Sequence, residues 1–305
     1  MHAPTRFRLA LLATLALALP LAPRAAEAEQ RSHVLRCGTG VHGGEAHGVI
    51  GVPQGDVFCP LVADPKAVRS FVTFLRGEFP TSANTTSIAS VGIGDALPLV
   101  RFGGPSPGEG LQLGLEAAVF AQFDLDAISD DLLNADYLVG FPLTYRYAGF
   151  SARARFYHQS SHLGDELLLR PENEIRRENL AFESLELILS QELGILRIYG
   201  GGEYLFNRRP ETLDPVVAHA GAEVRVGPFR GARVVAALDV KSTEQQEWTP
   251  AWSARAGFEI AWWRLPDHPP RVFSLLGEFY DGPSPYGQFF LESIRYVGAG
   301  VHLQL

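Results

Sequence analysis

Apolar and polar residues alternate over most of the chain. From about residue 70 onward, one parity of each run is apolar, the other is polar or small, and turn residues separate the runs. A period of two predicts β-strands with one apolar and one polar face. The predicted strands are 70–79, 87–102, 111–123, 132–147, 150–161, 178–191, 195–206, 215–226, 231–241, 251–263, 271–280 and 294–305.

About twelve strands of this kind are typical of a transmembrane β-barrel with a lipid-facing outside and a polar inside. Short connections such as 227–230 alternate with long ones such as 207–214 and 281–293, as periplasmic turns alternate with external loops. We therefore expect an all-β fold, a transmembrane antiparallel β-barrel in a bacterial outer membrane. Its partners would be outer-membrane lipids and, through the strand at 294–305, the barrel assembly machinery.

The N-terminal part of the chain has a different character. An apolar run at 9–21 follows two arginines and precedes an Ala-Glu-Ala sequence at 26–28, which predicts a secretory signal peptide over residues 1–28. Residues 29–69 are rich in glycine and interrupted by prolines, which predicts an irregular extension in the periplasm or in the lumen. Residues 70–305 are the predicted barrel.

The chain has two cysteines, Cys37 and Cys59. In an exported protein this pair predicts a disulfide bond. The alternative is a zinc site, because His33, His42 and His47 lie near Cys37. No C-x-x-C pair is present, so the disulfide is favoured, and neither a metal nor a cofactor is expected.

Charge and hydropathy exclude two classes of protein. The net charge of −8 provides no basic surface for phosphates, so no nucleic acid partner is expected. Beyond the signal, no apolar run approaches the ~18–20 residues of a membrane-spanning helix. The sequence does not indicate an oligomeric state.

Charges of both signs fall on the lumen-facing parity of the strands. They are Glu116, Arg146, Arg153, Arg155, Arg197, Glu203, Glu223, Arg225, Arg233, Asp239, Arg255, Glu259 and Glu278. They indicate either a selective pore or a salt-bridged interior that fills a small barrel. The second interpretation is favoured.

One strand breaks the pattern. In the run 150–161, His158 and Ser160 occupy the apolar parity that should face lipid. Residues two apart on a strand project to the same face, so an imidazole there can act as general base for the hydroxyl. The alternative is that both residues, with His162, mark the headgroup boundary, where apolar parity no longer matters.

A catalytic pair of this kind needs a third group that holds the imidazole in one tautomer. If the next strand folds back after Pro171, Glu183 comes to lie opposite the pair. A different register or loop would bring Glu172, Asn173 or Asp165 there instead.

Two resemblances bear on these residues. The segments 58–65, 134–137, 157–166, 200–204 and 280–288 resemble a bacterial family that carries only a domain-of-unknown-function label. That likeness implies an exported outer-membrane-type protein and no particular activity.

His158-Gln159-Ser160 resembles the His-x-Ser pair that outer-membrane phospholipase A and lipid A 3-O-deacylase present on a lipid-facing strand. Those families have Asn directly after the Ser, where this sequence has Ser161. Two functions therefore stay open. One is a narrow or plugged channel or structural barrel; the other is a lipid acyl-ester hydrolase that uses Ser160, His158 and Glu183.

Overall fold

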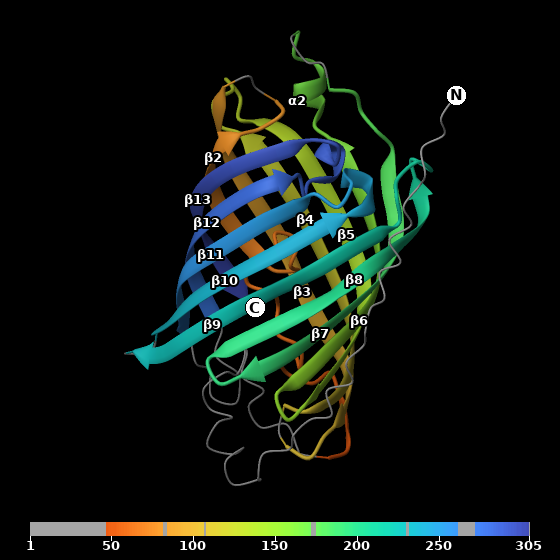
Figure 1. Ribbon diagram of the computed structural model, residues 1–305, viewed down its shortest axis with the longest axis vertical. Coiled ribbons are helices and arrows are strands. Elements are labelled where there is room, and N and C mark those ends of the chain that lie inside the picture. The colour runs from red at the N-terminus through yellow and green to blue at the C-terminus, as the bar shows by residue number, and fades with distance from the viewer. Residues whose placement is uncertain are drawn as a thin grey trace, which may run out of the picture.

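A closed β-barrel accounts for most of the structure. The computed structural model describes residues 47–81, 84–106, 108–171, 175–229, 232–261 and 272–304. Twelve antiparallel strands, β2 to β13, follow each other around the ring, which closes where β13 pairs with β2 (Figure 1). The predicted all-β fold with about twelve strands is confirmed.

Each predicted strand has a counterpart, with ends that shift by a few residues. The barrel strands are β2 (Ser70–Glu78), β3 (Thr85–Gly103), β4 (Gly110–Asp124), β5 (Asp131–Tyr147), β6 (Phe150–Leu163), β7 (Leu180–Leu193), β8 (Leu196–Arg209), β9 (Val216–Phe229), β10 (Ala232–Thr243), β11 (Pro250–Ala261), β12 (Val272–Pro283) and β13 (Ser293–Gln304). A short strand that the sequence did not predict, β1 (Val49–Gly51), pairs with the end of β3 outside the ring. No helix in the described part of the chain is long and apolar enough to cross a membrane.

The alternation in sequence becomes an alternation between the outside and the inside of the barrel. On β7, Leu185, Leu187 and Leu189 are exposed on the outer wall, whereas Glu186 and Ile188 between them are buried in the interior. A strand places successive side chains on opposite faces, so an apolar outer wall leaves every second position for the interior.

The two ends of the barrel are built differently. At one end the strands join through tight turns, such as Ala148-Gly149 between β5 and β6, where both residues have positive φ. Such turns suit the twist of a two-residue hairpin. The opposite end carries longer connections that contain α2 (Asp165–Leu168), η1 (Glu244–Gln246) and η2 (Gly287–Phe289), as Figure 1 shows for α2.

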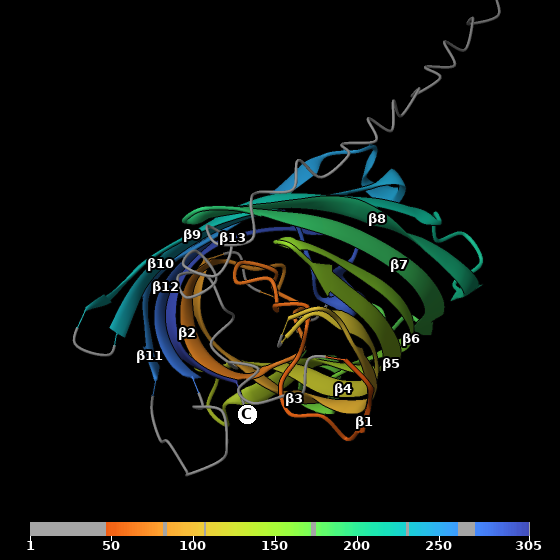
Figure 2. The same ribbon diagram turned by 90° about the horizontal axis from the view of Figure 1, so that it is seen from below.

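After β1, the N-terminal extension lies inside the barrel. We call residues 54–69 the plug; Figure 2 shows this segment within the ring of strands. Its backbone carbonyls accept hydrogen bonds from wall arginines, with Arg197 bound to Cys59 at 3.1 Å and Arg255 bound to Val62 at 2.9 Å. An irregular segment inside a barrel needs such partners, because buried backbone groups are costly when unpaired.

Apolar contacts also fix the plug. Phe58 and Leu61 pack with Ile188 and Tyr199 of the wall in one buried cluster. The Phe58 ring also lies under the Arg153 and Arg197 guanidinium groups, at 5.0 and 4.9 Å from its centroid. The plug is therefore held by the wall along its length.

Of the two cysteines, only Cys59 lies in the described residues. It is buried in the plug and is not a free thiol. Cys37, the signal peptide at 1–28 and two histidines of the alternative zinc site, His33 and His42, fall outside the described residues. His47 is described and exposed, and its amide donates to Gly104 O at 3.1 Å. The disulfide and the signal peptide stay predictions.

The loop between β12 and β13 folds inward over the mouth of the barrel. We call residues 284–292 the lid. The Gly287 amide donates to the Asp136 carboxylate, at 3.1 Å to Oδ2, and the Gln288 amide donates to Asn134 Oδ1 at 3.1 Å. Phe289 packs into an apolar cluster with Leu167 of α2, which closes the outer mouth.

Asp136 joins the three parts of the structure. Its carboxylate accepts the Gly287 amide of the lid, the Lys66 ammonium of the plug and the Ser161 hydroxyl of the wall. The side chain of Asp136 is fully buried and that of Lys66 is nearly so. This buried ion pair therefore connects the plug, the lid and the wall.

We expect Asp136→Ala to lower the free energy of unfolding by about 3–5 kcal/mol, because the Lys66 ammonium would stay buried without its partner. The measurement is urea-induced unfolding of the refolded barrel in lipid vesicles, followed by tryptophan fluorescence. The exposed loop carboxylate Asp126 provides a control, Asp126→Ala, with little expected change.

The double variant Lys66→Met/Asp136→Leu separates charge from packing. Removing both charges should recover a large part of the lost stability, because the unpaired ammonium is the main cost. A double variant as unstable as Asp136→Ala would contradict this explanation.

Candidate functional site

The candidate site lies on the outer wall, at the loop end of β6. His158 and Ser160 share the outward parity of β6 with Phe156, whereas Gln159 and Ser161 face inward and are buried. The polar pair therefore projects from an otherwise apolar surface, as the sequence pattern predicts.

Glu183 is the direct cross-strand partner of His158 in the β6–β7 ladder. Its carboxylate oxygen Oε1 lies 3.2 Å from His158 Nδ1. The His158 side chain is 44% exposed and that of Glu183 is 25% exposed, so the imidazole is accessible and the carboxylate partly shielded. The other oxygen, Glu183 Oε2, is buried without a hydrogen bond. This arrangement fixes one nitrogen of the imidazole and leaves Nε2 available.

Ser160 lies one step further along the same face, opposite Ala181 of β7 and Tyr137 of β5. Residues two apart on a strand are separated by about 6.6 Å, within reach of an imidazole and a hydroxyl that turn toward each other. Within the described residues, no hydrogen bond joins the Ser160 hydroxyl to His158. Catalytic hydrogen bonds are often long in unliganded enzymes and shorten when substrate binds.

The other residues considered for the third position lie elsewhere. Asp165 is exposed at the start of α2, where no hydrogen bond in the described chain links it to His158. Glu172 and Asn173 fall outside the described residues. Ser161, which occupies the position after the serine, points into the lumen and binds Asp136 and Asn134. Glu183 is thus the acidic partner that the register supplies.

Ionisable side chains on a lipid-facing wall are costly, and this cost makes His158 and Glu183 informative. A charged or strongly polar group placed toward lipid destabilises a barrel in a depth-dependent way. Ionisable residues within a membrane protein's span therefore indicate function by default. The orphaned Glu183 Oε2 adds to the cost.

The interior contains the thirteen charges that the sequence assigns to the lumen. All are buried except Arg146 and Arg233, which are partly buried. They form ion pairs within a strand, between neighbouring strands or across one intervening strand, namely Arg155–Glu116, Arg197–Glu223, Arg225–Glu223, Arg225–Glu259, Arg233–Glu259, Arg255–Glu278, Arg153–Glu186 and Arg146–Glu192. Glu203 accepts the Tyr157 and Ser184 hydroxyls, and Asp239 lies 2.6 Å from His219 Nε2. Eleven of the thirteen lumen charges are therefore in ion pairs, and Glu203 and Asp239 are compensated by hydrogen bonds.

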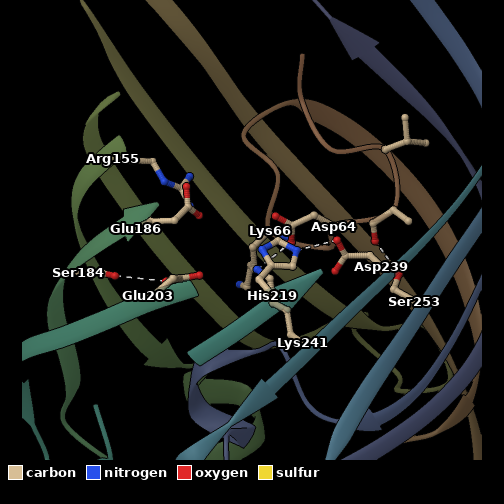
Figure 3. A network of polar contacts seen from close by, with 12 residues as sticks. Asp64, Lys66, Arg155, Ser184, Glu186, Glu203, His219, Asp239, Lys241 and Ser253 are labelled. Atoms are coloured by element: carbon tan, nitrogen blue, oxygen red, sulfur yellow. Dashed lines mark hydrogen bonds and ion pairs between the residues drawn. The ribbon is translucent and has the colours of Figure 1, made fainter. Parts of the chain in front are cut away.

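Sequence reasoning missed the charges that the plug brings into this network. Asp64 of the plug pairs with Lys241 of β10 at 3.0 Å, close to His219 and Asp239, as Figure 3 shows. Lys241 follows the alternation of its strand and was visible in the sequence. Its partner was not, because nothing local in residues 54–69 indicates which wall residues they meet.

A metal site inside the barrel has weak support. Glu186, Glu203 and His219 place one ligand atom each within 4.8 Å of one another, and all three are buried. Both oxygens of Glu186 are already engaged, however, because they pair with Arg153 and Arg155. Two guanidinium groups beside the carboxylate disfavour a further cation.

The fold and the outer site together define the class of this protein. It is an outer-membrane-type β-barrel whose lumen is filled by its own chain and whose outer wall carries a histidine, a serine and a glutamate. The family model described as "Protein of unknown function (DUF1207)" matches residues 33–305, and the chain belongs to that family. The resemblance in sequence to a family of unknown function is thereby confirmed. No curated protein matches the chain significantly.

Solved structures with a similar fold include outer-membrane phospholipases. Outer membrane phospholipase A from Escherichia coli is 14% identical, over 79% of this chain and 93% of that one, with a TM-score of 0.53. The calcium-bound dimer of the Salmonella typhi outer membrane phospholipase is 14% identical, over 79% and 94% of the two chains, with a TM-score of 0.50. At this identity the likeness shows the fold, that of bacterial outer-membrane barrels.

We expect the refolded protein to show no stepwise conductance in a planar lipid bilayer. The plug and the lid lie in the path through the barrel, and the plug is bound to wall side chains over much of its length. Single-channel recording at both voltage polarities measures this directly. Stable ohmic steps from the full chain would contradict a filled lumen.

Proposed function

We propose that this protein hydrolyses acyl esters of outer-membrane lipids at the outer wall of the barrel. The observation that carries the proposal is the contact between His158 Nδ1 and Glu183 Oε1 beside Ser160, all on the lipid-facing side. Ser160 is the nucleophile, His158 the general base and Glu183 the residue that orients the imidazole. The likeness to outer-membrane phospholipases supplies the fold only, so the assignment depends on these three residues.

The contact with Glu183 defines the tautomer that the reaction needs. When His158 donates its Nδ1–H to Glu183, Nε2 carries a lone pair and can accept the Ser160 proton. The carboxylate then stabilises the imidazolium that forms. The same geometry without a carboxylate would leave either nitrogen free to carry the proton.

The chemistry divides into two steps. The Ser160 oxygen attacks the ester carbonyl, its proton passes to His158, and the alcohol part of the lipid leaves with that proton as the acyl-serine forms. Water then attacks the acyl-serine with His158 again as base, and the fatty acid is released. Ser160 and neutral His158 are regenerated.

The position of the pair favours a membrane lipid as substrate. Outward-facing neighbours such as Phe156 and Tyr137 are exposed, as expected for a wall in contact with hydrocarbon. Ser160 lies three residues before β6 ends at Leu163, at the loop end of the barrel. Ester groups of lipids lie near such a boundary between hydrocarbon and headgroups.

A non-enzymatic barrel is the second candidate. A structural barrel agrees with the ion-paired interior, whereas an open channel would need the plug and the lid to move together. A headgroup boundary accounts for polar residues at this level of the wall. It gives no reason for a contact between His158 and Glu183 beside a serine, and therefore we place hydrolysis first.

We expect Ser160→Ala to reduce fatty-acid release to background and His158→Ala to lower it by about 10²–10⁴-fold. Release is measured by mass spectrometry with purified refolded barrel in vesicles of phosphatidylethanolamine and phosphatidylglycerol. Ser151→Ala, on the inner face of the same strand, is the matched control and should retain full activity. A fluorophosphonate probe should modify Ser160 alone. Equal fatty-acid release by the wild type and all three variants would contradict the proposal.

We expect Glu183→Gln to lower kcat by about 10²–10⁴-fold with little change in KM, because the carboxylate acts on the imidazolium of the transition state. Glu183→Asp should retain part of the activity. Glu211→Gln, an exposed loop carboxylate, serves as control. A change confined to KM would show that Glu183 contacts the lipid instead of orienting His158.

A further inference from the structure

A shallow apolar groove of about 540 Å³ crosses the outer wall next to His158. It reaches across the strands from β6 to β3 and includes Ser70 at the start of β2. Its lining includes Ile93, Ala117, Val119, Tyr137, Val139 and His158. The volume falls within the ~300–1,000 Å³ of sites that bind small molecules.

The register of the sheet explains why a groove forms here. His158 pairs with Val139, Val139 with Ala117, and Ala117 with Asp95, so these residues form one line across four strands. All four have the outward parity of their strands. The middle of the line consists of a valine and an alanine, whose short side chains leave the floor low.

Bulkier residues rise on both sides of this line. On the side toward the loops, Tyr137 and Ile93 are exposed and belong to the line that contains Ser160. On the side toward the turns, Phe141 and Leu97 are exposed. Ala117 therefore lies at the bottom of a trough between two rows of large apolar side chains.

The surroundings of the groove determine what occupies it. Its walls are apolar and lie on the membrane-facing side of the barrel, where hydrocarbon chains replace water. A trough one residue wide fits a single linear chain. One end is next to the proposed nucleophile, and the groove spans three strand spacings, about 14 Å, from β6 to β3.

We propose that this groove binds one acyl chain of the lipid whose ester is held at Ser160, and that Asp95 limits the length of that chain. The proposal deepens the proposed function and rests on it for the ester at Ser160. The chain lies along Val139 and Ala117 with its methyl end toward β3.

Asp95 gives the groove an end. Its carboxylate is exposed on the outer wall and accepts the Ala96 amide at 2.9 Å. An acyl chain that covered this carboxylate would remove its remaining polar contacts, and burial of a charged group in this way costs free energy. Longer chains must therefore leave the wall at Asp95, whereas shorter chains fit within the groove.

Two variants test the groove in opposite directions through the relative rates on didecanoyl and distearoyl phosphatidylethanolamine in mixed micelles. Ala117→Phe fills the trough and should shift the preference toward the shorter chain by roughly tenfold. Asp95→Leu removes the end of the groove and should shift it toward the longer chain. Ala236→Phe, at an exposed alanine on β10 across the barrel, is the matched control and should leave the ratio unchanged.

Binding is also measured without turnover. In a Ser160→Ala background, a phosphatidylethanolamine with a diazirine at the end of one palmitoyl chain is photolysed in vesicles, and the modified residues are identified by mass spectrometry. Cross-links should concentrate on residues 93–97 and 117–119. Adding Ala117→Phe should remove them, and adding Ala236→Phe should not.

The two proposals fail in different ways. Absence of hydrolysis in the wild type, with cross-links that Ala117→Phe removes, would overturn the proposed function and keep the acyl-chain site. Hydrolysis with an unchanged chain-length ratio in every variant would overturn the groove and keep the function. Cross-links spread evenly around the barrel would likewise overturn the groove.

Discussion

Neutralisation of buried charge is the constraint on which this structure depends. An apolar outer wall on every strand leaves the alternate positions facing a narrow interior, and many of them carry charges. Arg155 pairs with Glu116 and Glu186, and Arg225 pairs with Glu223 and Glu259, so wall residues on the same strand, the next strand or the strand beyond supply the compensation. Where the wall has cations left over, the plug contributes carbonyl oxygens and Asp64. The lumen is therefore closed by the same interactions that make it stable.

Because the plug fills the interior, the candidate catalytic residues lie on the outer wall of the barrel. Ser160 and Ser161 are adjacent in sequence, yet strand geometry sends one hydroxyl to the lipid side and the other to Asp136, Lys66 and the lid. The inner residue helps to fix the wall on which the outer residue sits. The buried contacts of Asp136 with Lys66, Ser161 and the lid lie behind β6 and support the outer site. The same sheet register that opposes Glu183 to His158 also aligns the low floor of the acyl groove.

The sequence allowed most of the barrel to be predicted, because a period of two is a local signal and needs no knowledge of neighbours. All twelve strands and the outward direction of His158 follow from it. The inward course of residues 54–69, β1 and the lid did not follow. Their residues show no periodicity. Their conformation depends on partners distant in sequence, such as Glu223, whose Oε1 accepts the Val62 amide. The position of Glu183 opposite His158 was an intermediate case. It could be predicted only by assuming that the chain folds back after Pro171, and Glu172, Asn173 and Asp165 stayed as alternatives.

By itself, the sequence determined which faces meet lipid and which residues can carry charge or act as nucleophile, because side-chain direction in a strand is set by parity. The tertiary structure alone decided which of these residues meet. Cross-strand register, the path of the plug and the fold of the lid arise from contacts between positions far apart in the chain, such as Val62 and Arg255, which are 193 residues apart. Such contacts depend on loop lengths and on the closure of the ring, which no single strand encodes.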